Sequence, residues 1–381
     1  MKITNVIAHA ISVPLEKPFY FSQGWVEKRS SLIIEIVTDN GISGWGEALC
    51  HGLQAPQIAA AFIENVFRPI LINRNPFDVE VLWEEMYNIT RPYGQGGSAV
   101  NAISGVDIAL WDIIGKSVNQ PIHRLIGGAF RQEVTPYATG FYRLANAIYP
   151  QDAIREAQTY VDAGFEAFKL KIGFGVKEDI AFIKAIRSAV GDDIKIMADA
   201  NGAYNVAEAR YLIKETEECD LYFLEELLAP EDLQGYRELK GLSKAYLAAG
   251  EQIFGKMGYR PWLEQRALDI IQPDICSSGG ITECKKIAAL AQAQHTMMIP
   301  HVWGSGIGIA ASLQFIASIP STPLCLNPTH PMLEFDQSSH PFRKDLICDG
   351  IKMMNGKVTI PTKPGIGVEI NRDIINRFKV N

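Results

Sequence analysis

Three acidic residues follow one another at equal intervals of 26 positions in this chain of 381 residues. Asp199, Glu225 and Glu251 each end a short apolar segment that reads as a buried strand, and a helix-length polar segment separates each pair. Such a repeat is typical of a parallel barrel, in which successive strand ends meet on one face. Three carboxylates there would supply the hard oxygen ligands that Mg2+ prefers. The spacing therefore predicts a magnesium site, because a helix cap or a salt bridge explains one such acid but not three in register.

Two lysines are placed to act beside that site. Lys169 and Lys171 flank Leu170 in a predicted strand, so both ammonium groups would face the barrel mouth. Each cation, close to the other and to Mg2+, disfavours protonation of its neighbour, so we expect a lowered lysine pKa and a usable base. A pair of solvated lysines is the weaker interpretation, because a strand covered by helices has no solvated face. Asn201 lies two residues after Asp199 and would face the same mouth as a neutral partner.

A carboxylate and a histidine end the next two predicted strands. Asp274 and His301 would lie at adjacent strand ends, where the carboxylate orients the imidazole as a general acid or base. A structural role is the better interpretation for four other histidines, and two remain undecided; the four are His9, His123, His295 and His340, and the two are His51 and His330. Glu334 follows the last predicted strand closely enough to reach the mouth, but an exposed linker acid is an equally good interpretation.

The rest of the chain must position these side chains. Residues 1–46 look like a three-stranded antiparallel sheet with a loop at 16–29, and helices are expected at 55–71, 77–90 and 98–117. Strands and helices then alternate, with strand candidates at 134–138, 167–172, 194–199, 221–225, 246–251, 268–274, 296–301 and, more weakly, 324–328.

This pattern predicts an α/β fold of three parts. Residues 131–330 would form a (β/α)7β TIM-like barrel, the catalytic domain, and residues 1–130 an N-terminal α+β capping domain. Residues 331–381 are too short to form a domain, so we expect them to pack back on the capping domain and complete it.

Composition narrows the possible partners and location. A net charge of -7 argues against nucleic acid or an anionic membrane surface, and no segment is expected to be long enough to span a membrane. Six cysteines without a CxxC pair suit buried thiols rather than disulfides. We therefore expect a cytoplasmic protein, a homo-oligomer, whose partner is a small-molecule carboxylate.

These residues together resemble the enolase superfamily, in its mandelate racemase-like branch. The resemblance covers nearly the whole chain and rests on the three acids, the Lys-x-Lys pair, the Asp–His pair and the helix at 102–112. It implies abstraction of the proton α to a carboxylate, giving an enediolate that Mg2+ and Lys169 stabilise, with Lys171 and His301 on opposite faces of the reacting carbon. Leu227 departs from the family, which usually has proline there; the change affects strand-end geometry and no ligand.

Within the branch, the segments 169–175, 301–304 and 332–336 look most like galactarolactone cycloisomerases and related acid-sugar enzymes. The expected function is the opening of an aldarolactone by β-elimination to a 3-deoxy-2-keto-hexarate. The alternatives are an acid-sugar dehydratase, acting on an aldonate or aldarate, and then a racemase or epimerase. A non-catalytic enolase-like binding protein would lack a ligand or a base, and none is missing here. The expected catalytic residues include Glu334, and the expected substrate contacts are Asn201, Trp25, His51 and Trp303.

Overall fold

The computed structural model describes residues 1–323 and 325–380. It begins with an antiparallel sheet of three strands in the order β1-β2-β3, namely β1 (Ile3–Phe21), β2 (Gly24–Thr38) and β3 (Ser43–Ala48). The predicted loop at 16–29 is wrong, because β1 and β2 continue there as a hairpin that pairs Phe19 with Val26. Both side chains are buried in an apolar cluster with Trp303, and this burial compensates for ordering the extended strands.

The helices of the N-terminal region pack on this sheet or on neighbouring helices. They are α1 (Pro56–Phe62), the π-helical turn η1 (Ile63–Phe67), α2 (Arg68–Leu71), α3 (Val79–Thr90), α4 (Ser98–Ser117) and α5 (Ile122–Leu125). Helix α4 lies so close to β3 that a Cβ at Gly46 would come within 2.0 Å of the Gly105 carbonyl oxygen. Glycine is therefore required at this contact.

Helix α4 also corrects one expectation from composition. It is long and apolar enough to cross a membrane, so the prediction that no segment reaches that length is wrong. In this fold, however, 89% of its apolar window is buried against β3 and neighbouring helices, as in the core helix of a globular protein.

The next region forms a curled sheet of eight parallel strands in the order β11-β10-β9-β8-β7-β6-β5-β12. The strands are β5 (Pro136–Thr139), β6 (Ala167–Lys171), β7 (Lys195–Asp199), β8 (Phe223–Glu225), β9 (Tyr246–Ala249), β10 (Ile270–Ile271), β11 (Met297–Met298) and β12 (Leu333–Asp336). The predicted eighth strand at 324–328 is wrong for residues 325–328, of which 325–327 form bends and 328 has no regular structure, and residue 324 lies outside the described residues. The eighth strand is β12 instead, where Leu333 pairs with Pro136 and is fully buried.

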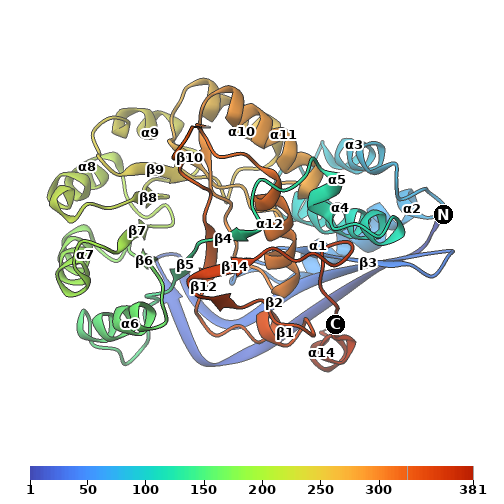
Figure 1. Cartoon of the computed structure of the whole chain (residues 1–381), viewed down its shortest axis with the longest axis horizontal. Helices are drawn as coiled ribbons and strands as arrows, with labels where there is room; N and C mark the ends of the chain where they lie inside the picture. The colour runs from blue at the N-terminus through green and yellow to red at the C-terminus, as the bar shows by residue number, and fades with distance from the viewer. Residues whose placement is uncertain (324, 381) are drawn as a thin grey trace.

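Helices alternate with these strands and lie outside them, as Figure 1 shows for the arc from α6 to α11. They are α6 (Gln151–Asp162), α7 (Val176–Val190), α8 (Val206–Glu215), the short 3-10 turn η2 (Glu217–Cys219), α9 (Leu233–Leu239), α10 (Gly255–Glu264), α11 (Gly280–Ala293) and α12 (Gly306–Ser318). Outward strand residues such as Leu170 and Leu224 join the buried core between sheet and helices.

A layer of mostly apolar side chains fills the inside of the curled sheet. One member lies on or beside each of the eight strands, and all are buried: Tyr137, Ala167, Met197, Phe223, Ala248, Ile270, Ile299 and Met332. Because side chains alternate along a strand, the residues two positions further on must face the same interior, nearer the carboxyl ends.

The C-terminal region comprises α13 (Pro341–Lys344), β13 (Met353–Met354), β14 (Lys357–Thr359) and α14 (Arg372–Phe378). β14 pairs with the short strand β4 (Glu133–Val134), and Val380 N–H donates to the Ala10 carbonyl of β1 at 2.9 Å. The chain end therefore lies against the N-terminal sheet, as Figure 1 shows for α14.

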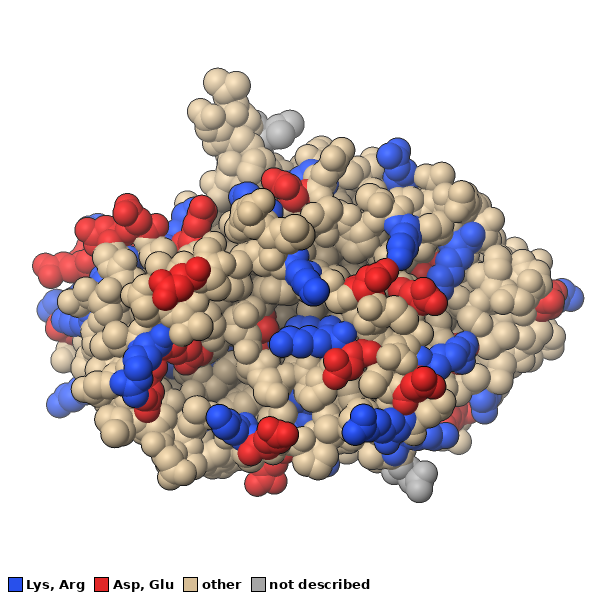
Figure 2. Space-filling view, turned by 60° about the horizontal axis from the view of Figure 1, so that its bottom comes forward, with Lys and Arg blue, Asp and Glu red and all other residues tan. Residues whose placement is uncertain are grey.

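The surface shows how the charged side chains and the cysteines are distributed. Positive and negative side chains are interspersed over most of the face in Figure 2. Four cysteines are buried thiols, but Cys325 and Cys348 are exposed, so the prediction of burial is wrong for these two.

Candidate active site

The layer above the apolar interior consists almost entirely of polar residues. Two positions beyond each member of the interior layer stand Thr139, Lys169, Asp199, Glu225, Gly250, Gln272, His301 and Glu334. Gly250 interrupts the alternation with a φ of +148°, and Glu251 rather than residue 250 brings a carboxylate to the site. The period of two thus places an apolar core and a polar site on the same strands, one layer apart.

The three carboxylates predicted from their spacing lie together. Each of Asp199, Glu225 and Glu251 offers an oxygen within 4.8 Å of the others, and all three are buried. Asn201 N–H donates to Asp199 Oδ1 at 2.9 Å, and Gln272 Nε2 donates to Glu225 Oε2 at 2.7 Å. A buried set of hard oxygen donors at this separation fits a small divalent cation, which would also compensate three adjacent negative charges.

The two lysines contact different members of this set. Lys169 Nζ lies 2.6 Å from Glu225 Oε1 and 2.8 Å from Glu334 Oε1. Lys171 Nζ lies 2.5 Å from Asp199 Oδ2 and 3.1 Å from Asn201 Oδ1. Both lysines project from β6 to the interior, as the strand alternation predicts.

The predicted lowering of the lysine pKa included a bound Mg2+ and stays a prediction; the protein groups by themselves raise the pKa of both lysines. Burial alone would lower the pKa of Lys171, but the carboxylate of Asp199 outweighs it and raises the pKa above its ordinary value. At Lys169, burial is likewise outweighed by Glu225 and Glu334, so that its pKa is raised as well. A divalent cation among the same carboxylates would offset part of their negative charge and lower both values.

His301 contacts carboxylates other than those that Lys171 contacts. Its Nδ1 lies 2.7 Å from Asp274 Oδ2, and its Nε2 lies 3.1 Å from Glu251 Oε2 and 4.0 Å from Glu334 Oε2. Burial alone would lower the pKa of His301, but Glu251, Glu334 and Asp274 outweigh burial and raise it to about 10. The Asp274 hydrogen bond fixes the ring so that Nε2 faces the site.

Glu334, left undecided by the sequence, lies inside the site on β12. It is buried, accepts from Thr139 Oγ1 at 2.7 Å and from Val302 N–H at 3.0 Å, and pairs with Lys169. Sequence reasoning missed Thr139 and Gln272. A signal existed for Gln272, because it lies two residues before Asp274 on the same predicted strand.

A cavity of about 600 Å³, here called the mouth cavity, opens above the carboxylates, and His51, Asn201 and Glu251 are among its lining residues. His51 Nε2 lies 3.3 Å from Glu251 Oε1, and its ring is parallel to that of His301 at 6.2 Å. The other two predicted substrate contacts do not line this cavity. Trp25 is 45% exposed and packs on Tyr20, and Trp303 is buried.

Trp303 reaches the site through its neighbours instead. Its Nε1 donates to Tyr142 Oη at 2.9 Å, and the Arg29 guanidinium stacks on its ring at 4.1 Å. Its ring also lies 5.8 Å from that of His51. Trp303, itself fixed by Tyr142 and Arg29, therefore packs against the His51 ring and helps to hold it in place.

Another buried carboxylate fixes the segment that carries His301. Glu47 of β3 accepts hydrogen bonds from Ser31 Oγ, from the backbone and hydroxyl of Ser305, and from Gly308 N–H at 2.5–3.0 Å. Ser305 and Gly308 form the start of α12, so this carboxylate binds a helix N-terminus. The contact ties the N-terminal sheet to the backbone just after His301.

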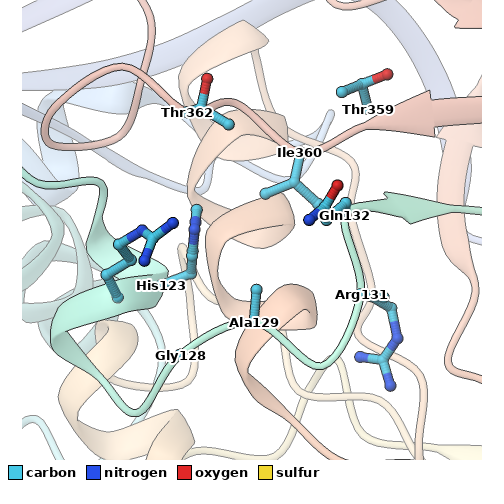
Figure 3. Close-up of a pocket in the computed structure, with 9 residues that line it drawn as sticks. His123, Gly128, Ala129, Arg131, Gln132, Thr359, Ile360 and Thr362 are labelled. Atoms are coloured by element: carbon cyan, nitrogen blue, oxygen red, sulfur yellow. The ribbon is translucent and has the colours of Figure 1, made fainter.

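A second cavity, of about 320 Å³, lies beside α5 and β14 and shares no lining residue with the mouth cavity. In Figure 3 the Arg131 guanidinium points away from His123; it donates to the Ile319 carbonyl at the end of α12. His123 bonds through Nδ1 to Gln314 of the same helix at 2.7 Å. The hydrogen bonds of Arg131 and His123 therefore fix α12. We assign these residues a structural role, because neither of them lines the mouth cavity.

Two family models cover most of the chain. Residues 3–127 match the mandelate racemase / muconate lactonizing enzyme N-terminal domain, and residues 152–374 match the enolase C-terminal domain-like family.

Known proteins match all or most of the chain. D-galactarolactone cycloisomerase of Agrobacterium fabrum is 40% identical and covers 100% of this chain and 99% of its own. Arabinonate dehydratase of Saccharolobus solfataricus is 33% identical, over 91% of this chain and 89% of its own. The crystal structure of the 3,6-anhydro-D-galactonate cycloisomerase from Zobellia galactanivorans superposes with a TM-score of 0.89 at 34% identity, covering 100% of both chains. The chain therefore belongs to the enolase superfamily, in its mandelate racemase and muconate lactonizing enzyme group.

Proposed function

We propose that this protein abstracts the proton α to the carboxylate of a sugar acid and then eliminates a β oxygen. Asp199, Glu225 and Glu251 would hold one Mg2+, which would neutralise charge on the substrate carboxylate when bound. Lys169, buried beside Glu225, would donate to that carboxylate and stabilise the enediolate. The membership in the enolase superfamily and the buried oxygen donors support this reading.

The observation that supports the proposal is that two candidate bases contact different carboxylates of the same buried set. Lys171 contacts Asp199, whereas His301 contacts Glu251. The two side chains therefore bind to different carboxylates of the set. A substrate carbon held above the cluster would meet Lys171 on one side and His301 on the other. One group would take the α-proton, and the other would donate a proton, either to the leaving hydroxyl of a dehydration or to the β carbon of the enol after lactone opening.

The preferred reaction is the opening of an aldarolactone. Removal of the α-proton leaves an electron pair that forms a carbon–carbon double bond while the bond to the β ring oxygen breaks. The ring oxygen belongs to the lactone ester, so it leaves as a carboxylate and needs no proton. The resulting enol takes a proton at the β carbon, for which His301 is the candidate donor, and loses its hydroxyl proton to give a 3-deoxy-2-keto acid. The relatives named as cycloisomerases of galactarolactone and of anhydrogalactonate support this choice.

The alternative is dehydration of an open-chain acid sugar. Hydroxide is a much poorer leaving group than the carboxylate released from a lactone and needs a proton, which His301, held by Asp274, would donate. The relative named as an arabinonate dehydratase supports this second candidate. Racemisation or epimerisation would use the same two groups without elimination.

One experiment tests the shared first step and separates the outcomes. The enzyme with Mg2+ is incubated with galactarolactone in deuterated water, and the α-proton and the product are followed by NMR. We expect loss of the α-proton signal and a 3-deoxy-2-keto product. The reaction is then repeated in water labelled with oxygen-18, where a label entering a product carboxylate would show hydrolysis instead of elimination. Turnover of open-chain acids alone would favour the dehydratase.

We also propose the wider organisation expected from the sequence. The parts would be a capping domain of residues 1–130, a closed (β/α)7β barrel of residues 131–330 extended by β12, and a C-terminal segment of residues 331–381. The contact of Val380 with Ala10 supports the return of the chain end to the capping domain. A homo-oligomer in the cytoplasm completes the proposal, and light scattering coupled to gel filtration tests the oligomer.

A further inference from the structure

The mouth cavity has an unusual charge pattern. Among its described lining residues there is no lysine or arginine, whereas two carboxylates line it, those of Glu231 and Glu251. The remaining polar lining is largely neutral and includes five side-chain amides, those of Gln23, Gln54, Asn101, Asn201 and Gln252. The cations of the site, Lys169 and Lys171, do not line the cavity and are engaged by the buried carboxylates.

This pattern disfavours a negative charge at the far end of a substrate. One substrate carboxylate would be held at the metal-binding carboxylates beside Lys169. A second carboxylate, at the other end of a six-carbon chain, would enter the mouth cavity without a counter-ion, and the lining carboxylate that no metal would compensate is that of Glu231. A like charge placed in such a position lowers affinity, and a desolvated anion needs a paired cation.

The same lining is suited to neutral oxygens. Asn201 accepts from Lys171 through Oδ1, so its Nδ2 remains as a donor, and Gln252 donates to Glu226 through Nε2, so its Oε1 remains as an acceptor. His51 Nε2 is a buried atom without a hydrogen bond, although Glu251 Oε1 lies 3.3 Å away. The lining thus offers both donors and acceptors, and a hydroxyl group can pair with either.

We propose that the mouth cavity selects sugar acids whose end remote from the reacting carboxylate is uncharged, a lactone or an alcohol, and discriminates against open-chain dicarboxylates. The inference rests on the proposed function and deepens it, because it names the charge state of the substrate. It also distinguishes the lactone of an aldarate, which carries one negative charge, from the aldarate itself, which carries two.

A matched pair of acids tests this directly. Galactonate and galactarate differ only at the last carbon, which is an alcohol in the first and a carboxylate in the second. Their binding to the Mg2+-loaded enzyme is measured by calorimetry. We expect galactonate to bind at least about tenfold more tightly than galactarate, with a ratio that shrinks as salt is added.

A charge variant strengthens the test. Leu53 lines the cavity and is 54% exposed, so Leu53→Lys adds a cation at little structural cost. Leu53→Met is the matched control of similar length without charge. We expect Leu53→Lys to raise the affinity for galactarate about tenfold relative to galactonate, and Leu53→Met to leave the ratio unchanged.

The outcomes for this inference and for the proposed function are separate. Equal or tighter binding of galactarate by the unmodified enzyme would overturn the inference, and so would a failure of both acids to bind. A galactarate affinity that does not respond to Leu53→Lys would overturn it too. Exchange of the α-proton in deuterated water reports on the function alone: exchange with both acids and equal affinities would retain the function and reject the selectivity.

Discussion

Asp274→Asn replaces one carboxylate oxygen in the candidate site by an amide nitrogen. We expect this change to move the proton of the neutral His301 ring from Nδ1 to Nε2. Asp274 Oδ1 accepts from Cys276 N–H at 2.7 Å, and its backbone carbonyl accepts from Ser278 N–H at 2.7 Å, so the side chain cannot turn freely. In the variant, the amide oxygen would keep the bond to Cys276, and the amide nitrogen would face His301 Nδ1. That ring nitrogen must then accept, which places the proton on Nε2.

The size of the effect follows from the loss of acid–base function at Nε2. A neutral ring protonated at Nε2 cannot accept a proton from substrate and is a weak acid towards a leaving oxygen. General acid–base catalysis contributes about 10²- to 10⁴-fold, so we expect kcat to fall by roughly that factor. Stability should change much less, by about 1–3 kcal/mol for one charge-assisted hydrogen bond in the buried pair.

The assay is kcat for product formation with Mg2+, measured beside α-proton exchange in deuterated water. Exchange through Lys171 should survive in Asp274→Asn, because Lys171 contacts Asp199 and not Asp274. The double variant of Asp274→Asn with His301→Asn should be no slower than His301→Asn alone, because both substitutions remove one function. An Asp274→Asn enzyme within about threefold of the original, beside an inactive His301→Asn enzyme, would refute the reasoning.

Three further predictions test other parts of the structure. Glu225→Gln should weaken Mg2+ binding by at least about tenfold in calorimetry and abolish turnover with an unchanged circular dichroism spectrum; undiminished affinity would place the metal elsewhere. Burial would raise the pKa of Asp336, but Arg343 and Arg29 lower it to about 2, so its stabilisation is present above its unfolded pKa and lost as pH falls through about 2. The original protein should therefore lose about 2 kcal/mol of stability between about pH 4 and 2 that Asp336→Asn does not lose, measured by urea unfolding, and parallel pH profiles would contradict this. Glu47→Ala should lower the free energy of unfolding by about 3 kcal/mol or more, because buried donors lose their acceptor, whereas a loss below about 1 kcal/mol would show that water replaces it.

Spacing along the chain predicted the parts of the site that lie on regular strands. Lys169, Asp199 and Glu225 each lie two positions beyond an apolar interior residue, so alternation alone places them on one face. Glu251 obeys the interval of 26 positions, but it reaches the site only because Gly250 bends the strand, which the sequence does not show. Membership in the enolase superfamily, expected from the same residues, is confirmed by the family models.

Other features depend on tertiary contacts that no local pattern encodes. The hairpin at 16–29 contains a bulge between Pro14 and Phe19, which breaks the alternation, and its stability comes from burial against Trp303. β12 was missed because its alternation is short and it is fixed by pairing with β5, almost two hundred positions earlier. Glu334 belongs to that strand, and for this reason the sequence left its role open.

The stacking of a catalytic layer directly on an apolar layer has an evolutionary consequence. Seven of the eight strands, with the residues that directly adjoin them, place a side chain in both layers, so a single inserted or deleted residue within such a strand would exchange inward and outward side chains in both layers at once. Such a change would lose the core and the chemistry together. Lineages with this architecture can therefore vary in length only in the loops and in the capping elements. The strand residues that carry out the first step of the reaction should therefore change little during evolution, whereas the loops and capping elements that select the substrate can change.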